Sequence, residues 1–236
     1  MKIKRGVLLL MAGILAGGAV YRYKKQRCFR CEGVSTAPAA HAAAPSAIVS
    51  DRLPFDWPPR IGQPYPDIEG IDQTGQKVRL AFFKGKVILL EPVGMNCPMC
   101  QQFAGAGKYG GFQMPMTPGI QSLEEWIPQH AGLSRDDPSY VYVQVLLFSM
   151  TMKPTTPDDA KAWADHFKMD RSKNRIVLAM GPAYLQPSYY QASYNLVPGL
   201  QLIDKDFILR WDATSDSPKQ SWWRDVLPNL PKLIAE

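Results

Sequence analysis

The chain has 236 residues, of which 46% are hydrophobic and 20% are charged, and this composition excludes a protein that is disordered throughout. Its formal net charge of +6 is local, because eight basic residues and no acidic residue lie before residue 32. The remaining 19 basic residues are balanced by 21 acidic ones, so the rest of the chain is near neutral and no nucleic-acid partner is expected.

The N-terminal segment, residues 1–31, is typical of a membrane signal. A short basic stretch precedes an apolar run of about 15 residues, Gly6–Val20, which has the length of a signal peptide and is slightly short for a membrane span. Tyrosines after the run extend it at the membrane interface, so we expect membrane contact through residues 6–23. We expect an uncleaved signal-anchor forming one transmembrane helix, and cleavage after Ala19 is the alternative.

Residues 32–58 form an Ala/Pro-rich linker of the kind that holds a domain away from a membrane. Five basic residues follow the apolar run and three precede it, which by the positive-inside rule argues against export of the C-terminal part. The linker and a cysteine pair suited to an oxidising compartment argue for export. We therefore expect a bacterial inner-membrane protein whose domain, residues 59–236, lies in the periplasm or another extracytoplasmic space.

A first pair of cysteines, Cys28 and Cys31, lies in the basic segment with no strand before it. Neighbouring arginines favour the thiolate form, so the pair has the chemistry to relay electrons. It could equally carry a lipid, pair between chains or be incidental, and its spacing alone does not choose between these roles.

Apolar patterns predict seven strands in the domain, at residues 66–72, 77–80, 86–91, 140–148, 175–179, 200–203 and 207–211. Helices are predicted where a capping residue or a proline starts a helical pattern, at residues 98–104, 122–127, 157–167 and 218–227. An insertion occupies about residues 105–135, and residues 182–194 form a loop or a partly helical segment. Right-handed crossovers then give an α/β fold, a three-layer α/β/α sandwich with a mixed central sheet and an N-terminal β-hairpin extension.

The strongest chemical signal is the sequence Cys97-Pro-Met-Cys100, between a predicted buried strand and a predicted helix. Free backbone N–H groups and the positive end of the helix dipole stabilise a thiolate at such a position. Pro98 suits the first helical position, where its missing N–H costs nothing. This arrangement predicts reversible disulfide chemistry. The alternatives are a structural disulfide or half of a zinc site, and zinc would need two more ligands.

Glu91 lies inside the apolar strand, six residues before Cys97. A carboxyl group in an apolar strand must be neutral or paired, and a raised pKa would suit it to moving a proton. The alternative is a side chain that escapes to solvent at the end of the strand, beside Pro92.

Methionines cluster around the cysteine pair in the sequence and, because strand ends converge at one edge of a doubly wound sheet, are expected near it in space. Thioether and thiolate sulfur together form a soft ligand set that selects Cu(I). The alternative is that the methionines fill irregular apolar gaps or offer an adaptable surface to client peptides. The candidate Cu(I) ligands are Cys97, Cys100, Met114, Met116, Met150 and Met152.

Five motifs follow one another along the domain: Ile61–Ile68, Asp72–Leu80, Phe83–Leu90, Cys97–Cys100 and Val197–Asp206. Together they span about residues 60–236 with one insertion. In this order they resemble the thioredoxin superfamily, and more closely its TlpA/ResA-like and AhpC/TSA-like branch. The resemblance implies a thioredoxin fold and a membrane-anchored, extracytoplasmic thiol–disulfide oxidoreductase, whose partners are client protein thiols or disulfides and a redox partner.

The resemblance also implies roles for four residues. Cys97 is the nucleophile and Cys100 the resolving thiol, so the redox-active disulfide Cys97–Cys100 takes the place of a separate cofactor. Glu91 stands where thioredoxins carry a buried acid that accepts the proton of the second thiol. Pro198 stands where the family has a cis-proline that faces the disulfide and docks the client backbone. The direction of electron flow is not indicated, because relatives with a proline after the first cysteine include both oxidants and reductants.

The chain departs from related families at several positions. Asn96 replaces the aromatic residue usually found before the first cysteine, and Gly94 replaces the threonine of peroxiredoxins, which argues against peroxidase chemistry. SCO-type copper proteins share the layout, but they space their cysteines by three residues and carry a ligand histidine near Val197-Pro198, which is absent here. An SCO-like Cu(I) chaperone is therefore the alternative function. A weaker third is an accessory subunit that docks through residues 105–135.

Overall fold

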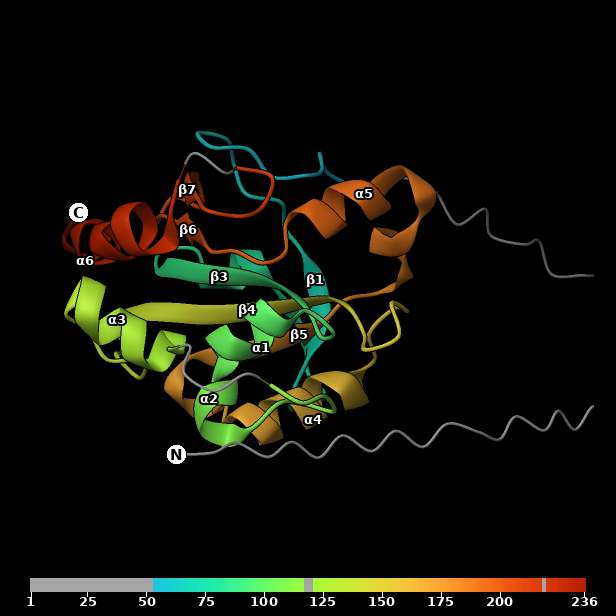
Figure 1. Ribbon diagram of the computed structural model, residues 1–236. Coiled ribbons are helices and arrows are strands. Elements are labelled where there is room, and N and C mark those ends of the chain that lie inside the picture. Colours follow the sequence, from blue (N-terminus) through green and yellow to red (C-terminus); the bar gives the residue numbers. More distant parts are fainter. Residues whose placement is uncertain (1–52, 117–120, 218–219) are drawn as a thin grey trace, which may run out of the picture. The chain divides into compact units, whose positions relative to one another are not determined.

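The computed structural model describes residues 53–116, 121–217 and 220–236 (Figure 1). In this part of the chain, seven strands form one sheet in the order β2-β1-β5-β4-β3-β6-β7. β3 pairs in parallel with β4 and β4 with β5, and the other pairs are antiparallel, so the sheet is mixed as predicted. The strands are β1 (Glu69–Asp72), β2 (Lys77–Arg79), β3 (Val87–Gly94), β4 (Tyr140–Phe148), β5 (Arg175–Ala179), β6 (Gln201–Ile203) and β7 (Leu209–Asp212).

Helices cover both faces of the sheet. Every residue of β3, β4 and β5 is buried, and because alternate side chains point to opposite faces, both faces must be covered. α4 packs on β5 and β1, and α6 packs on β3, which confirms the predicted three-layer sandwich (Figure 1). The α-helices are α1 (Pro98–Ala104), α2 (Ala106–Tyr109), α3 (Leu123–Ala131), α4 (Pro157–Phe167), α5 (Pro187–Asn195) and α6 (Leu230–Ala235).

Local sequence explains where α3 and α4 begin. Thr156 caps α4 by accepting from the Asp159 N–H while the Asp159 carboxylate accepts from the Thr156 N–H, and Ser122 with Glu125 forms the same capping box at α3. α3 extends beyond the predicted residues 122–127 and passes through Pro128. Burial of Ile127 and Ala131 offsets the hydrogen bond that the proline cannot make.

The C-terminal prediction was wrong. Instead of one helix over residues 218–227, the described residues form a π-helical turn at Trp222–Val226, a 3₁₀ turn at Leu227–Asn229 and then α6. Pro228 and Pro231 each occupy the first turn of the element that contains them, where a proline starts a helical turn rather than ending one.

The segment just before the domain contacts α5 and the turn before it. The Leu53 N–H donates to the Tyr189 hydroxyl at 3.1 Å, and the Trp57 indole N–H donates to Ser193 Oγ at 3.0 Å. The Trp57 ring also packs edge-on against Tyr184. Residues 1–52 lie outside the described residues. They include the predicted anchor, most of the predicted linker, and Cys28 with Cys31. Among the residues that are described, no helix has both the length and the apolarity needed to cross a membrane.

Candidate active site

Cys97 lies where β3 ends and α1 begins. It is the N-cap of α1, its N–H donates to the Gly94 carbonyl at 2.9 Å, and its sulfur accepts the Cys100 N–H at 3.3 Å. Pro98 occupies the first turn of α1, as the sequence predicts. Both cysteines are in the thiol form, with Cys97 partly exposed and Cys100 completely buried. One sulfur can therefore be reached from solvent, whereas the other is shielded from it.

The surroundings of the two thiols shift their acidity in opposite directions. A hydrogen bond from the Cys100 thiol, together with the backbone N–H groups of Cys100 and Met99, lowers the pKa of Cys97 to about 7 despite partial burial. Burial raises the pKa of Cys100 well above its usual range, and the charges of Cys97 and Glu91 raise it further. Near neutral pH, about half of Cys97 is therefore in the thiolate form, whereas Cys100 keeps its proton.

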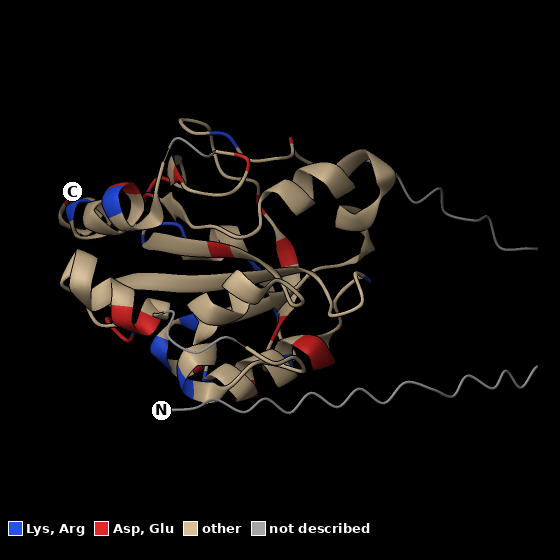
Figure 2. Cartoon of the chain, viewed as in Figure 1, with Lys and Arg blue, Asp and Glu red and all other residues tan. Residues whose placement is uncertain are grey.

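Glu91 is the acidic residue of β3, and it is fully buried with no cationic partner among the described residues. Figure 2 shows in red where acidic residues lie within the sheet. Oε2 of Glu91 accepts hydrogen bonds from the Tyr142 hydroxyl and from Gln144 Nε2, the latter at 2.7 Å. Its Oε1 has no hydrogen-bond partner in the described part of the chain. Burial raises the pKa of Glu91 to about 8, although the two hydrogen bonds oppose that shift. The side chain therefore does not escape to solvent, and it can gain or lose a proton near neutral pH.

The strand register brings the partners of Glu91 together. Glu91 lies opposite Gln144 in the parallel β3–β4 pair, and Tyr142 lies two residues earlier on β4, on the same face. Trp163 of α4 donates its indole N–H to Gln144 Oε1 at 2.9 Å, which leaves the Gln144 amide nitrogen directed at Glu91. Sequence reasoning missed these residues. The period-two appearance of Tyr140, Tyr142 and Gln144 in an otherwise apolar strand is the signal that could have found them.

The loop before β6 lies at the same end of the sheet as Cys97. The Val197–Pro198 peptide bond is cis, and β6 runs antiparallel to β3, so this loop lies beyond the C-terminal part of β3 that leads to Cys97. The Val197 N–H donates to the Tyr194 carbonyl at 3.2 Å, and the Val197 carbonyl accepts from Ser215 Oγ at 3.1 Å. That carbonyl oxygen keeps a second lone pair, which can accept a further hydrogen bond.

Gln101 fixes the methionine-bearing loops beside α1. Its buried amide donates to the carbonyls of Met95 and Phe112 at 2.7 and 3.0 Å and lies 3.9 Å from the Met150 sulfur, while its Oε1 accepts the Phe112 N–H. Phe112 belongs to the turn that carries Met114 and Met116. Met116, Met150 and Met152 are partly buried against the core. In the described ranges, no three His, Cys, Asp or Glu side chains are grouped as a metal site.

No protein-family model matches the chain, and no curated protein sequence matches it. Several solved structures are similar. The thioredoxin domain of a thiol-disulfide oxidoreductase from Bacteroides vulgatus is 18% identical, with 65% of this chain and 87% of that chain covered and a TM-score of 0.42. A putative protein disulfide isomerase from Bacteroides thetaiotaomicron is 13% identical, with coverages of 75% and 92% and a TM-score of 0.47. A SCO1/SenC family lipoprotein from Bacillus anthracis is 16% identical, with coverages of 75% and 100% and a TM-score of 0.46.

Proposed function

We propose that this chain is a membrane-anchored, extracytoplasmic thiol–disulfide oxidoreductase that exchanges disulfides with cysteines of client proteins. The observation that carries the proposal is the asymmetric cysteine pair: a partly exposed Cys97 with a lowered pKa and a buried Cys100 with a raised pKa, beside a buried acid. An N-terminal anchor through residues 6–23 and a bacterial inner-membrane location are part of the proposal and rest on the sequence alone.

Exchange takes two steps. The Cys97 thiolate attacks one sulfur of a client disulfide, which forms a mixed disulfide and releases the other client sulfur as a thiolate. Cys100 then loses its proton and attacks the Cys97 sulfur, which forms the Cys97–Cys100 disulfide and releases the second client sulfur. The client gains two electrons and the cysteine pair loses two. The same steps in reverse oxidise a client dithiol.

Glu91 is the proposed acceptor of the Cys100 proton, because its pKa of about 8 allows it to ionise in the neutral to mildly alkaline range. Tyr142 and Gln144 are positioning residues, since both hold Oε2 and leave Oε1 free to take the proton. Pro198 and the adjacent Val197 carbonyl are the proposed docking point for the client backbone.

The test uses the full-length chain and a peptide disulfide. The Cys97→Ser variant should lose exchange, and the Cys100→Ser variant should accumulate a mixed disulfide that is visible by mass spectrometry. A Cys28→Ser/Cys31→Ser variant is the matched control and should keep its activity. Full exchange by both the Cys97→Ser and Cys100→Ser variants would refute the proposal.

A Cu(I)-binding chaperone is the second candidate, and the observation that favours it is the set of loops that Gln101 holds beside α1. The candidate ligands are Cys97, Cys100, Met114, Met116, Met150 and Met152. The deciding measurement is the reduction potential of Cys97/Cys100 with and without equimolar Cu(I). Tight copper binding that blocks oxidation of both thiols favours the chaperone, and a potential that barely moves favours the oxidoreductase. Copper binding that survives Met→Leu changes at all four methionines would remove them from the ligand set.

A further inference from the structure

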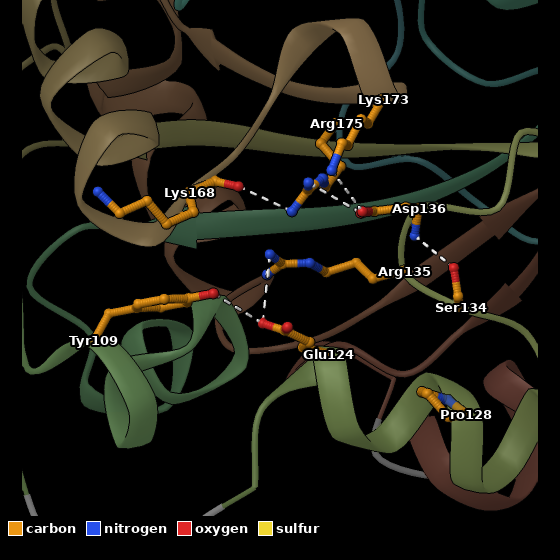
Figure 3. A pocket seen from close by; sticks show the side chains of 9 residues that line it. All are labelled: Tyr109, Glu124, Pro128, Ser134, Arg135, Asp136, Lys168, Lys173 and Arg175. Carbon is orange, nitrogen blue, oxygen red and sulfur yellow. Dashed lines mark hydrogen bonds and ion pairs between the residues drawn. The ribbon is translucent and has the colours of Figure 1, made fainter.

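A polar pocket of about 470 Å³ lies at the end of the sheet opposite Cys97 (Figure 3). β5 begins at Arg175, and the loop between α3 and β4 supplies Arg135 and Asp136, so the pocket lies at the N-terminal ends of these parallel strands. Its volume falls within the range of small-molecule sites. We call it the basic pocket; its lining residues are Tyr109, Glu124, Pro128, Ser134, Arg135, Asp136, Lys168, Lys173 and Arg175.

Two arginine side chains of the basic pocket are buried but only partly paired. The side chains of Arg135 and Arg175 are each 5% exposed. Within the described residues, Nε and Nη1 of Arg135 and Nε of Arg175 have no hydrogen-bond acceptor. Among the residues that the structure describes, Arg135 makes one ion pair, from Nη2 to Glu124, and its distance is long at 3.5 Å. A guanidinium group cannot shed its charge at any ordinary pH, so burial with unused donors is costly until an anion supplies acceptors.

The carboxylates of the basic pocket are too few for its cations. Glu124 is shared between Arg135 and Lys108, and Asp136 is shared between Arg175 and Lys173. The ammonium group of Lys168 bonds only to a backbone carbonyl among the described residues. Figure 3 shows the two guanidinium groups side by side between the two carboxylates. The lining thus carries four cations against two anions, an excess of two positive charges.

We propose that the basic pocket binds a phosphate group, either as inorganic phosphate or at the end of a phosphate monoester. A phosphate dianion matches the excess charge of the lining, and its oxygens match the planar donor forks of Arg135 and Arg175. Arg135 can turn toward the phosphate because its ion pair with Glu124 is long and therefore weak. Lys168 and Lys173 are mostly exposed and act at the rim, where their flexible side chains fold over the ligand.

The site is independent of disulfide exchange. It uses no residue of the cysteine site and lies at the other end of the sheet, so a chain with both cysteines replaced by serine keeps it. The proposal therefore stands or falls separately from the proposed function.

The test is isothermal titration of the full-length chain with inorganic phosphate and, separately, with phenyl phosphate, at constant ionic strength held by sodium chloride. We expect one site with a Kd below about 1 mM. The Lys168→Gln/Lys173→Gln variant should bind at least tenfold more weakly. The matched control, Lys77→Gln/Lys232→Gln, removes the same charge from exposed positions outside the basic pocket and should change Kd less than twofold.

The two titrations distinguish a phosphate monoester site, a site for inorganic phosphate and the absence of a site. Binding of both anions assigns the site to a phosphate monoester, and binding of inorganic phosphate alone assigns it to the free anion. No saturable heat with either anion, or equal weakening in the two double variants, would overturn the proposal. An Arg135→Lys variant keeps the charge but removes the donor fork, and it should also bind at least fivefold more weakly. Should that variant fail to fold, the exposed lysine pair still decides the question.

Discussion

The two ends of the sheet bury different ionisable side chains, an acid at one end and two arginines at the other, and burial affects them differently. At the Cys97 end, burial of Glu91 without a cation raises its pKa to about 8, so the acid holds a proton at neutral pH. At the other end, Arg135 and Arg175 cannot lose their charge and are left with unused donors. Burial raises the pKa of a carboxyl group until it holds a proton, whereas a buried guanidinium group keeps its charge and needs hydrogen-bond acceptors.

The two ends are joined along one face of the sheet. Arg175 lies opposite Tyr142 in the β4–β5 pair, and the Tyr142 hydroxyl donates a hydrogen bond to Glu91. Gln144 follows on the same face of β4 and also contacts Glu91. Arg175, Tyr142 and Glu91 therefore form a row of polar side chains across a sheet face that is otherwise apolar. Glu91 and the arginines can each be substituted separately.

The largest expected effect is on stability at alkaline pH. The folded-state pKa of Glu91, about 8, lies above its unfolded value, so the folded state binds more protons between these values and stability falls as pH rises through them. We expect Glu91→Gln to stabilise the fold by roughly 2–4 kcal/mol above pH 8 and by little near pH 4.5. Urea unfolding across pH 4.5–9 measures this difference. A difference that stays constant with pH would contradict the assignment of a buried, protonated acid.

The second prediction concerns the rate of resolution. If Glu91 accepts the Cys100 proton, Glu91→Gln should slow decay of the mixed disulfide by about 10²-fold, as expected for loss of a general base. The first attack by Cys97 should slow less than threefold. Stopped-flow measurement with an aromatic disulfide follows both steps. Equal slowing of the two would show that Glu91 acts on the structure of the site rather than on the second proton transfer.

The third prediction isolates a positioning residue. The Tyr142 hydroxyl stabilises the ionised form of Glu91, so Tyr142→Phe should raise the pKa of Glu91 further, by about one unit for a lost hydrogen bond to a charged group. The rise of the resolution rate with pH should move to higher pH, with about fivefold slower resolution at pH 8, because the ionised fraction of Glu91 falls by that factor. Tyr140→Phe is the matched control, because the Tyr140 hydroxyl donates to the Ser134 carbonyl instead. A pH profile that moves equally in both variants would exclude the positioning role.

The sequence was sufficient where the information is local. Cys97, Pro98 and Cys100 form a contiguous motif, and burial of Glu91 follows from the apolar strand around it. Capping residues likewise predicted the starts of α3 and α4.

Other features depend on long-range pairing. Tyr142 meets Glu91 only through the parallel register of β3 and β4, and Arg135 meets Arg175 only because two loops converge at the ends of neighbouring strands. The C-terminal helix was misjudged for a related reason. A proline can end one helical turn or start the next, and at Pro231 packing of Leu230 and Leu233 into the core selects the second.

The smallest expected effect is on the free energy of unfolding when Arg135 is replaced, and it tests whether this arginine is incompletely paired. In chloride buffer, replacing the incompletely paired Arg135 by leucine should change the free energy of unfolding by less than about 1 kcal/mol, because the lost ion pair is weak and Arg175 loses a like-charged neighbour. In phosphate at 100 times the parent's Kd, the parent chain should gain about 2.7 kcal/mol, and a variant that binds at least tenfold more weakly should gain no more than about 1.4 kcal/mol. Urea unfolding in the two buffers gives both values. A large loss in chloride would mean that Glu124 already satisfies Arg135, and the two ends of the sheet would then differ only in sign.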